Sequence, residues 1–358
     1  EHVKSFQGLR MAPLLTLDIA TLLQIHESLY KTIATVKAHK PHFLALHCQE
    51  CGGKSLESGV TEVERFVKEL MAAQELKDYS RARVYIDESY ESPERFTVST
   101  TIYSCIYTYT FTYKVTGKEI RTIRQQKSPM VQKEKFPADF FPQEMSLTKF
   151  FFPPHSDFDL VNVHLFHDAH NVVAWKESPS YYAGIRQKAM DFVLQRISDE
   201  RHKKLPFFLF GDFNFRLDAR PLFEHLCSTG TLEAITNTNN DVDKLIFRET
   251  NNDRKLLQFD KELLVFKDRL DEMEITFPPT YPYSEDVHHA KQYNTTRCPA
   301  WCDRILMSTS AKHLIAKQEN EENSIVYDNI GPNVCMGDHK VTPGASAIFL
   351  FYCKLISL

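Results

Sequence analysis

The sequence lacks any apolar run long enough to cross a bilayer, and it lacks a basic excess. No apolar segment reaches the roughly 18 residues that a membrane helix needs, and the first residues show no secretory pattern. The 43 lysines and arginines are outnumbered by 47 aspartates and glutamates, which gives a net charge of −4. A broad nucleic-acid or membrane footprint is therefore not expected. A polyanionic substrate is compatible with this balance if basic groups gather in one cleft.

The cysteines form no framework. Eight are spread along the chain, and the closest pairs that resemble ligand or redox spacing are Cys48 with Cys51 and Cys298 with Cys302. Neither pair is accompanied by a second C-x-x-C or by two histidines at zinc spacing. We expect reduced thiols, as in a cytoplasmic protein, with a zinc or redox pair as the minor alternative.

The chain has an ordinary globular composition, with 42% hydrophobic and 25% charged residues. Its 358 residues contain no evident repeat or low-complexity linker, so we expect one domain over 1–358. Patterns of period 2 and period 3.6 alternate along the sequence, which predicts a layered α/β fold. Strands are expected at 14–19, 42–47, 83–86, 96–115, 158–165, 301–307 and 347–352, helices at 22–37, 63–71, 182–193 and 256–270, and a loop at 127–154.

The most informative segment is P-F-F-L-F-G-D-F-N-F-R-L-D at 206–218. An apolar run stops at a glycine, as a buried strand does at its end. Asp212, Asn214 and Arg216 then follow at alternate positions. Side chains two apart on an extended backbone point the same way. A carboxylate, an amide and a guanidinium are thus offered together at the rim of a sheet, where they can hold a water and orient a phosphoryl oxygen.

Polar residues also cluster at 49–50, 162–164 and 303–304, which are expected strand ends, and at 337–340. Each cluster alone has an ordinary structural explanation, such as a solvated loop carboxylate, a core histidine or a turn. Their conjunction on one α/β scaffold is the layout expected of a site built at a sheet edge.

These residue types favour metal-assisted phosphoester hydrolysis. Magnesium is held by one or two carboxylates together with waters and phosphate oxygens, a role that suits Glu50. Asp212 can orient or deprotonate a water. Asn214 and His164 can donate to non-bridging oxygens, where charge grows in the transition state. His339 has an acidic neighbour and can do the same as an imidazolium.

Two motifs resemble the signatures of the inositol polyphosphate 5-phosphatases. They are F-L-F-G-D-F-N-F-R at 208–216 and R-C-P-A-W-C-D-R-I-L at 297–306. The segments F-P-P-T-Y-P-Y at 277–283 and G-D-H-K at 337–340 also match that family. The resemblance runs with gaps from about 14 to 340, and it is closest to the type I branch, which acts on inositol 1,4,5-trisphosphate.

The resemblance implies a DNase I-like fold, a four-layer sandwich of two mixed sheets flanked by helices. It implies Mg²⁺-dependent removal of the 5-phosphate from soluble inositol 1,4,5-trisphosphate and 1,3,4,5-tetrakisphosphate, which ends a calcium signal. It further implies that Glu50 binds the metal with Asp338 beside it, and that Asp212 and Asn214 orient the attacking water.

The same resemblance assigns phosphate contacts. His339 contacts phosphate with Asp303 as its partner, and His164 lies in the motif that contacts the scissile phosphate. The candidate contacts to the other phosphates are Arg304, Arg297, Arg186, Lys188 and Lys340, to which the alternating pattern adds Arg216.

The chain departs from the family pattern in several places. Asp18 stands where family members have a metal-site asparagine, which should tighten Mg²⁺ binding while repelling the substrate phosphate. The segments 149–156 and 253–259 also differ, and 341–358 is divergent. The branch ends in a prenylation box, whereas this chain ends in L-I-S-L with Cys353 too far from the end. We therefore expect a cytoplasmic monomer without a membrane anchor of its own, unlike prenylated relatives at the plasma membrane.

Two alternatives stay open. A DNase-like or abasic-site nuclease shares the fold and the G-D-x-N chemistry, because a fold alone does not settle function; the tryptophan motif and the acidic net charge oppose it. A catalytically impaired relative that binds inositol phosphates is the other, and intact Glu50, Asp212, Asn214 and His339 oppose it.

Overall fold

The computed structural model describes sixteen stretches of the chain. They are residues 37, 43–49, 68–77, 79–86, 106–113, 119–122, 131–135, 146–150, 158–168, 178–198, 205–239, 241–248, 254–315, 327–328, 337–339 and 348–353. The strand expected at 14–19 and nearly all of the helix expected at 22–37 lie outside these residues.

One sheet has five strands in the order β13-β1-β3-β2-β4. Its members are β1 (Phe43–Gln49), β2 (Tyr79–Ile86), β3 (Ile106–Tyr113), β4 (Glu119–Thr122) and β13 (Ile348–Cys353). The pairings are antiparallel except for β2 with β4, so the sheet is mixed. The strand expected near the C-terminus is confirmed as β13, which pairs with β1.

The other main sheet has six strands in the order β11-β12-β8-β7-β6-β5. They are β5 (Val131–Lys135), β6 (Ser146–Phe150), β7 (Asp159–His164), β8 (Phe207–Asp212), β11 (Leu270–Glu272) and β12 (Asp303–Ser308). Only β7 and β8 run parallel among these pairs. The loop expected at 127–154 is wrong, because β5 and β6 form there; charged side chains on an edge strand such as β5 obscure its pattern.

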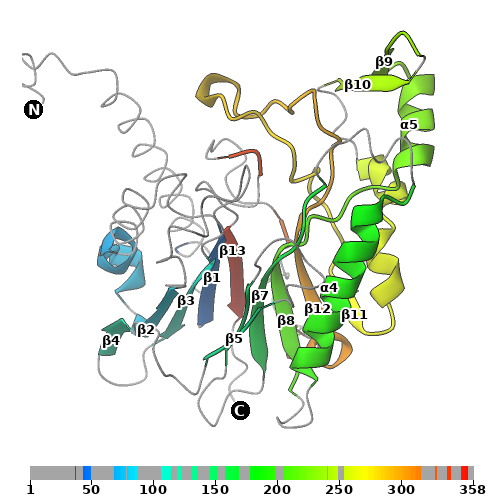
Figure 1. Ribbon diagram of the computed structural model, residues 1–358. Helices are drawn as coiled ribbons and strands as arrows, with labels where there is room; N and C mark the ends of the chain where they lie inside the picture. Colours follow the sequence, from blue (N-terminus) through cyan, green and yellow to red (C-terminus); the bar gives the residue numbers. More distant parts are fainter. Residues whose placement is uncertain are drawn as a thin grey trace, which may run out of the picture.

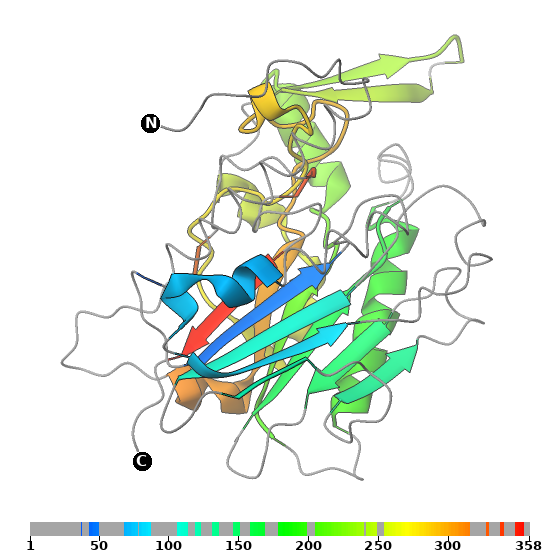
Figure 2. The same cartoon turned by 90° about the vertical axis from the view of Figure 1, so that its left-hand side faces the viewer.

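The two sheets lie face to face with helices outside them (Figures 1 and 2). Helix α4 (Tyr181–Ile197) covers the six-stranded sheet, and helical residues 68–72 lie over the five-stranded one. The buried face of α4 includes Met190 and Val193, which belong to one core cluster with Val161 and Leu209. This is the DNase I-like sandwich of two mixed sheets that the sequence predicts.

A smaller lobe follows β8. It contains α5 (Ala219–Ser228) and the hairpin of β9 (Leu232–Thr236) and β10 (Val242–Phe247), whose core includes Trp301. The single helix expected at 256–270 is wrong, because two 3₁₀ helices form instead, η3 (Arg254–Phe259) and η4 (Glu262–Phe266). The carbonyl of Phe259 accepts from Asp218 N–H at 2.7 Å rather than continuing a helical ladder.

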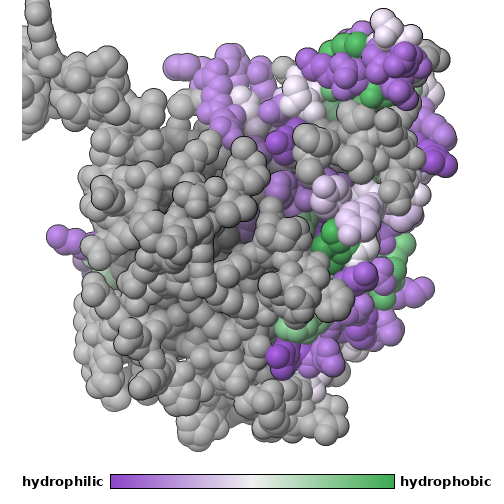
Figure 3. Space-filling view, viewed as in Figure 1, coloured by the Kyte–Doolittle hydropathy of each residue, from purple (hydrophilic) through white to green (hydrophobic). Residues whose placement is uncertain are grey.

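Short 3₁₀ turns complete the described secondary structure: η1 (Gln74–Leu76), η5 (Val287–His289) and η6 (Thr309–Ile315). Among the helices within the described ranges, none is long and apolar enough to span a bilayer. The described surface in Figure 3 is mainly hydrophilic, with small apolar patches.

Candidate active site

Three strands bring acidic and imidazole groups to one edge of the six-stranded sheet. Because β7 and β8 are parallel, His164 and Asp212 end their strands side by side. Strand β12 runs the other way, so its first residue, Asp303, pairs with Asp212. All three side chains are buried. Sheet register therefore assembles groups that are about 50 to 140 positions apart in the sequence.

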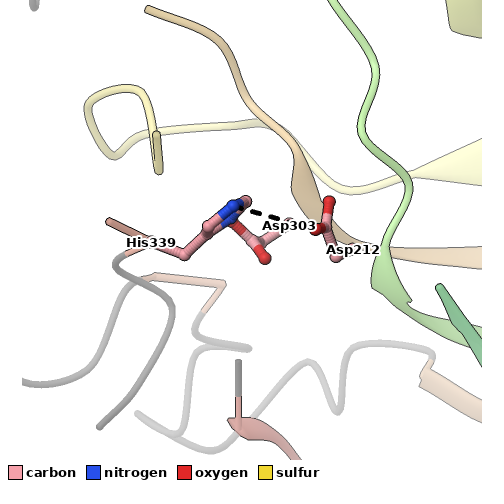
Figure 4. A group of neighbouring side chains, drawn as sticks. All are labelled: Asp212, Asp303 and His339. Carbon is pink, nitrogen blue, oxygen red and sulfur yellow. Dashed lines mark hydrogen bonds and ion pairs between the residues drawn. The ribbon is translucent and has the colours of Figure 1, made fainter. Parts of the chain in front are cut away.

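His339 closes this cluster from the far end of the chain (Figure 4). Its Nδ1 lies 2.9 Å from Asp303 Oδ2, and its Nε2 lies 3.8 Å from Asp212 Oδ2. The carboxylate of Asp338 is 3.9 Å from the same Nε2. The structure thus brings His339 to the partner that the sequence assigned to it, Asp303, and leaves its other nitrogen facing Asp212.

Asn214 is held in a left-handed conformation, with φ of 52°, which asparagine tolerates better than most residues. This bend folds its backbone N–H onto Asp212 Oδ1 at 2.8 Å, and its side-chain nitrogen onto Asp212 Oδ2 at 2.9 Å. The same nitrogen donates to Leu165 O at 2.9 Å. Both side-chain amide hydrogens of Asn214 are used within the protein, so Asn214 orients the Asp212 carboxylate. The sequence had suggested that this amide donates to a phosphate, and its position does not allow that.

The ring of Tyr281 packs against both Arg216 and His339. Arg216 Cζ lies 4.4 Å from the centre of its ring, and the His339 ring lies 4.8 Å away. Its hydroxyl accepts from Arg297 Nη1 at 2.9 Å. The sequence pattern assigned no role to Tyr281, although this residue lies in the family motif at 277–283.

The protonation states favour ion pairing. Burial by itself disfavours the charged form of Asp212, but the charge of His339 and the contacts of His164 outweigh it and lower the pKa of Asp212 to about 2. Burial likewise disfavours a charged His339, yet Asp303 and Asp212 raise its pKa well above the usual 6.5. At neutral pH the site therefore holds an ionised Asp212 beside an imidazolium.

His167 is a second residue that sequence reasoning missed. It is half-buried, and burial followed by the charges of Arg216, His164 and Arg297 lowers its pKa. A neutral imidazole beside two arginines marks a locally positive region next to the cluster. Its place three residues after His164 was the available signal.

Two of the expected phosphate contacts are wrongly assigned. Arg186 is fully buried, with its guanidinium held by Glu262 and Asp168. Arg304 is 1% exposed and pairs with two further carboxylates. Both guanidinium groups are enclosed by the protein and held by carboxylates, so neither is accessible to a ligand.

The remaining basic candidates differ in placement. Arg297 is exposed and contacts Tyr281, and Lys188 is exposed on α4. Arg216 lies behind Asn214, to which its Nη2 donates at 2.7 Å. Lys340 lies outside the described residues, as do the expected metal ligands Glu50 and Asp18; strand β1 ends one residue before Glu50.

The described part of the site suits a divalent cation. Donor atoms of Asp212, Asp303 and His339 lie within 4.8 Å of one another. With Asp338, three carboxylates surround the His339 imidazolium, which leaves a net negative charge. Hard carboxylate oxygens in excess over positive charge are what Mg²⁺ or Ca²⁺ binds.

The cysteines described do not support a zinc or redox pair. Burial raises the pKa of Cys298 and of Cys302 to about 12, and neither belongs to a group of metal-ligating side chains among the described residues. The Cys302 thiol instead donates to Phe215 O at 3.6 Å.

Comparison with known proteins follows the same direction. The model of the Endonuclease/Exonuclease/phosphatase family 2 matches residues 26–341. Inositol polyphosphate-5-phosphatase A of Homo sapiens is 48% identical over 385 residues, which cover 93% of each chain. The Caenorhabditis elegans protein named "Probable type I inositol 1,4,5-trisphosphate 5-phosphatase" is 30% identical over 404 residues, covering 91% of this chain and 97% of that protein.

Among solved structures, the inositol polyphosphate 5-phosphatase domain of SPSynaptojanin, crystallised with inositol (1,4)-bisphosphate and calcium ion, aligns over 92% of both chains at 15% identity with a TM-score of 0.43. The match of the family model establishes that the chain belongs to the endonuclease/exonuclease/phosphatase family. Within that class, the chain belongs to the inositol polyphosphate 5-phosphatases.

Proposed function

We propose that this chain is a Mg²⁺-dependent phosphomonoesterase that removes the 5-phosphate from soluble inositol 1,4,5-trisphosphate and 1,3,4,5-tetrakisphosphate, and so terminates calcium signalling. The observation that carries the proposal is the 48% identity to a human inositol polyphosphate 5-phosphatase over 93% of each chain. The cluster of Asp212, Asp303 and His339 supplies groups that such a reaction needs.

The reaction assigns a role to each group of the cluster. The ionised Asp212, aligned by two hydrogen bonds from Asn214, accepts a proton as the water oxygen bonds to phosphorus. The His339 imidazolium, held by Asp303, neutralises charge that grows on a non-bridging oxygen. The bond between phosphorus and the oxygen on ring carbon 5 breaks, that oxygen takes up a proton from solvent and leaves as the alcohol, and Asp212 returns its proton to solvent.

The metal site is proposed around Glu50, Asp18 and Asp338. Asp338 lies beside the His339 imidazolium in the described structure, and the other two residues are assigned by resemblance to the family. Bound Mg²⁺ would polarise the phosphoryl group and offset the charge of the substrate. The excess of carboxylates in the described cluster supports a cation there.

The substrate is a compact polyanion, so a positive region is needed beside the acidic cluster. Arg297 and Arg216 supply one: both contact Tyr281, and both depress the pKa of His167. We place the phosphate groups of the inositol ring that are not cleaved on this side of the site.

The direct test is phosphate release from inositol 1,4,5-trisphosphate with Mg²⁺ and with EDTA, and ³¹P NMR to identify which phosphate is lost. We expect Mg²⁺-dependent loss of the 5-phosphate alone. Cleavage of duplex or abasic DNA instead would move the assignment to the nuclease class, and tight binding without turnover would mark an impaired relative.

We also propose that the chain acts in the cytoplasm as a monomer and without nucleic acid. Light scattering during gel filtration measures the oligomeric state, and a stable dimer would overturn that part. Co-sedimentation with anionic vesicles measures membrane binding in the same preparation.

A further inference from the structure

A buried arginine on α4 is bonded directly to the segment after β7 and, through Glu262, to the segment after β8. Arg186 is 0% exposed. Its Nε and Nη2 donate to the two oxygens of Glu262 at 2.8 and 2.6 Å. Its Nη1 donates to Phe166 O at 3.0 Å and to the carboxylate of Asp168. A planar guanidinium fork fixes the direction of each of these bonds, which a point charge does not.

The first segment follows β7. Phe166 and Asp168 come two and four residues after His164, whose Nε2 lies 3.5 Å from Asp212 Oδ2. Between them, Leu165 O accepts from the Asn214 side chain at 2.9 Å. By bonding Phe166 O, Arg186 fixes the backbone that presents both of these contacts.

The second segment follows β8. Glu262 Oε1 accepts from Arg216 N–H at 3.0 Å as well as from Arg186. Arg216 in turn donates from Nη2 to Asn214 Oδ1 at 2.7 Å. The Asn214 side chain is therefore bonded to Leu165 O on one side and to Arg216 on the other. Arg186 fixes both partners, the first through Phe166 O and the second through Glu262.

We propose that Arg186 is a positioning residue, which through Phe166 O and Glu262 sets the spacing of the β7 and β8 segments and thereby the orientation of Asn214 and the Asp212 carboxylate. The expected effect on kcat rests on the function proposed above, whereas the expected effect on the geometry of the two segments does not. Since Arg186 has no exposed surface, it acts on turnover and not on substrate capture.

The test compares Arg186→Lys with Leu194→Ala, a core change on the same helix. A lysine keeps the charge but cannot bond Glu262 and Phe166 O with one rigid fork. We expect Arg186→Lys to lower kcat by about 10- to 100-fold with KM within about threefold of wild type. Leu194→Ala is assayed at the temperature at which its unfolding free energy equals that of Arg186→Lys, and there it should keep the kcat of the wild type. Hydrogen exchange at 213–217 should rise in Arg186→Lys and not in Leu194→Ala.

The two proposals fail in distinguishable ways. A wild-type protein that releases no 5-phosphate defeats the proposed function, while exchange at 213–217 still decides the role of Arg186. An active wild type with unchanged kcat in Arg186→Lys, or a loss equal to that in Leu194→Ala, overturns the positioning role. If Arg186→Lys does not fold, Glu262→Gln takes its place; its amide oxygen still accepts from Arg216 N–H, so an intermediate fall in kcat is expected, and no fall overturns the proposal.

Discussion

Asp303 and Arg304 are neighbours on β12, yet they belong to two different kinds of polar region. Asp303 joins the cluster of Asp212 and His339, where carboxylates outnumber the imidazolium. Arg304 turns to the opposite face, where its Nε donates to Trp301 O at 2.8 Å and its terminal nitrogens pair with Asp260 and Glu272. Both are about 1% exposed, so burial does not distinguish them.

The two regions differ in their excess of negative charge and in their exposure to solvent. Tyr327 donates to Glu272 at 2.8 Å, and both carboxylates of the Arg304 region pair with the guanidinium, although Asp260 Oδ1 accepts no hydrogen bond. The Asp303 region has three carboxylates around one imidazolium, against two around the Arg304 guanidinium, and its His339 is partly exposed. A closed network of buried charges stabilises one arrangement, whereas an open one can receive a ligand and its charge.

The largest expected effect is on the open cluster. Asp212→Asn should lower kcat by about 10³- to 10⁴-fold, since a general base contributes on that order. The unfolding free energy should also fall, but by less than the activation free energy rises, because the asparagine loses the charge that pairs with His339 and His164. Phosphate release and urea denaturation of the same preparation measure both quantities. Loss of stability equal to the loss of activity would erase the contrast with the Arg304 region.

His339→Gln should come next. It removes the imidazolium that faces Asp212 at 3.8 Å, and loss of one charge-stabilising donor costs about 10²- to 10³-fold in kcat. The matched control is His289→Gln, an exposed histidine paired with Asp286 at 2.8 Å. Steady-state kinetics should show wild-type turnover in the control.

A smaller effect is expected at Tyr281, where ring and hydroxyl act separately. Tyr281→Phe keeps the ring beside His339 and Arg216 but loses the bond to Arg297, so KM should rise while kcat holds. Tyr281→Leu also removes the ring and should lower kcat by about 3- to 10-fold, the value of an aromatic or cation–π contact. Equal kcat in the two variants would contradict a role for the ring.

The pH dependence gives the mildest test. The pKa of His339 is raised above 6.5. The stabilisation of the folded protein by its charge is therefore fully present below pH 6.5, and it is lost only as the pH rises through the higher pKa of the folded state. The pKa of Asp212 is lowered from 3.8 to about 2. The stabilisation of the folded protein by its carboxylate is therefore present above pH 3.8, and it is lost as the pH falls through about 2. We expect kcat to stay level through pH 6.5 and to fall at clearly higher pH. A fall centred on pH 6.5 would contradict this.

The sequence predicted much of this arrangement, for identifiable reasons. The apolar run before Asp212 and its parallel partner before His164 were visible as strands, and a shared sheet edge follows from their direction. The pairing of His339 with Asp303 came from resemblance, since 36 residues separate them and no local pattern joins them.

Other features were beyond a reading of the sequence. Asp303 and Arg304 look like one polar cluster in the chain, and only the alternation of a strand sends them to opposite faces. Arg186 resembles a surface cation of an amphipathic helix, and its partner Glu262 is 76 positions away. Asn214 needed the positive φ to show that its amide bonds Asp212 and not a phosphate.

The most direct test of the contrast is to measure kcat and the unfolding free energy for Asp303→Asn and Arg304→Met side by side. We expect Asp303→Asn to lower kcat by about 100-fold with a change in unfolding free energy of about 1 kcal/mol. Arg304→Met should lower the unfolding free energy by about 3–5 kcal/mol, with kcat of the folded protein within about threefold of wild type. Equal losses of activity and stability in both variants would contradict the division of β12 into a catalytic face and a structural face.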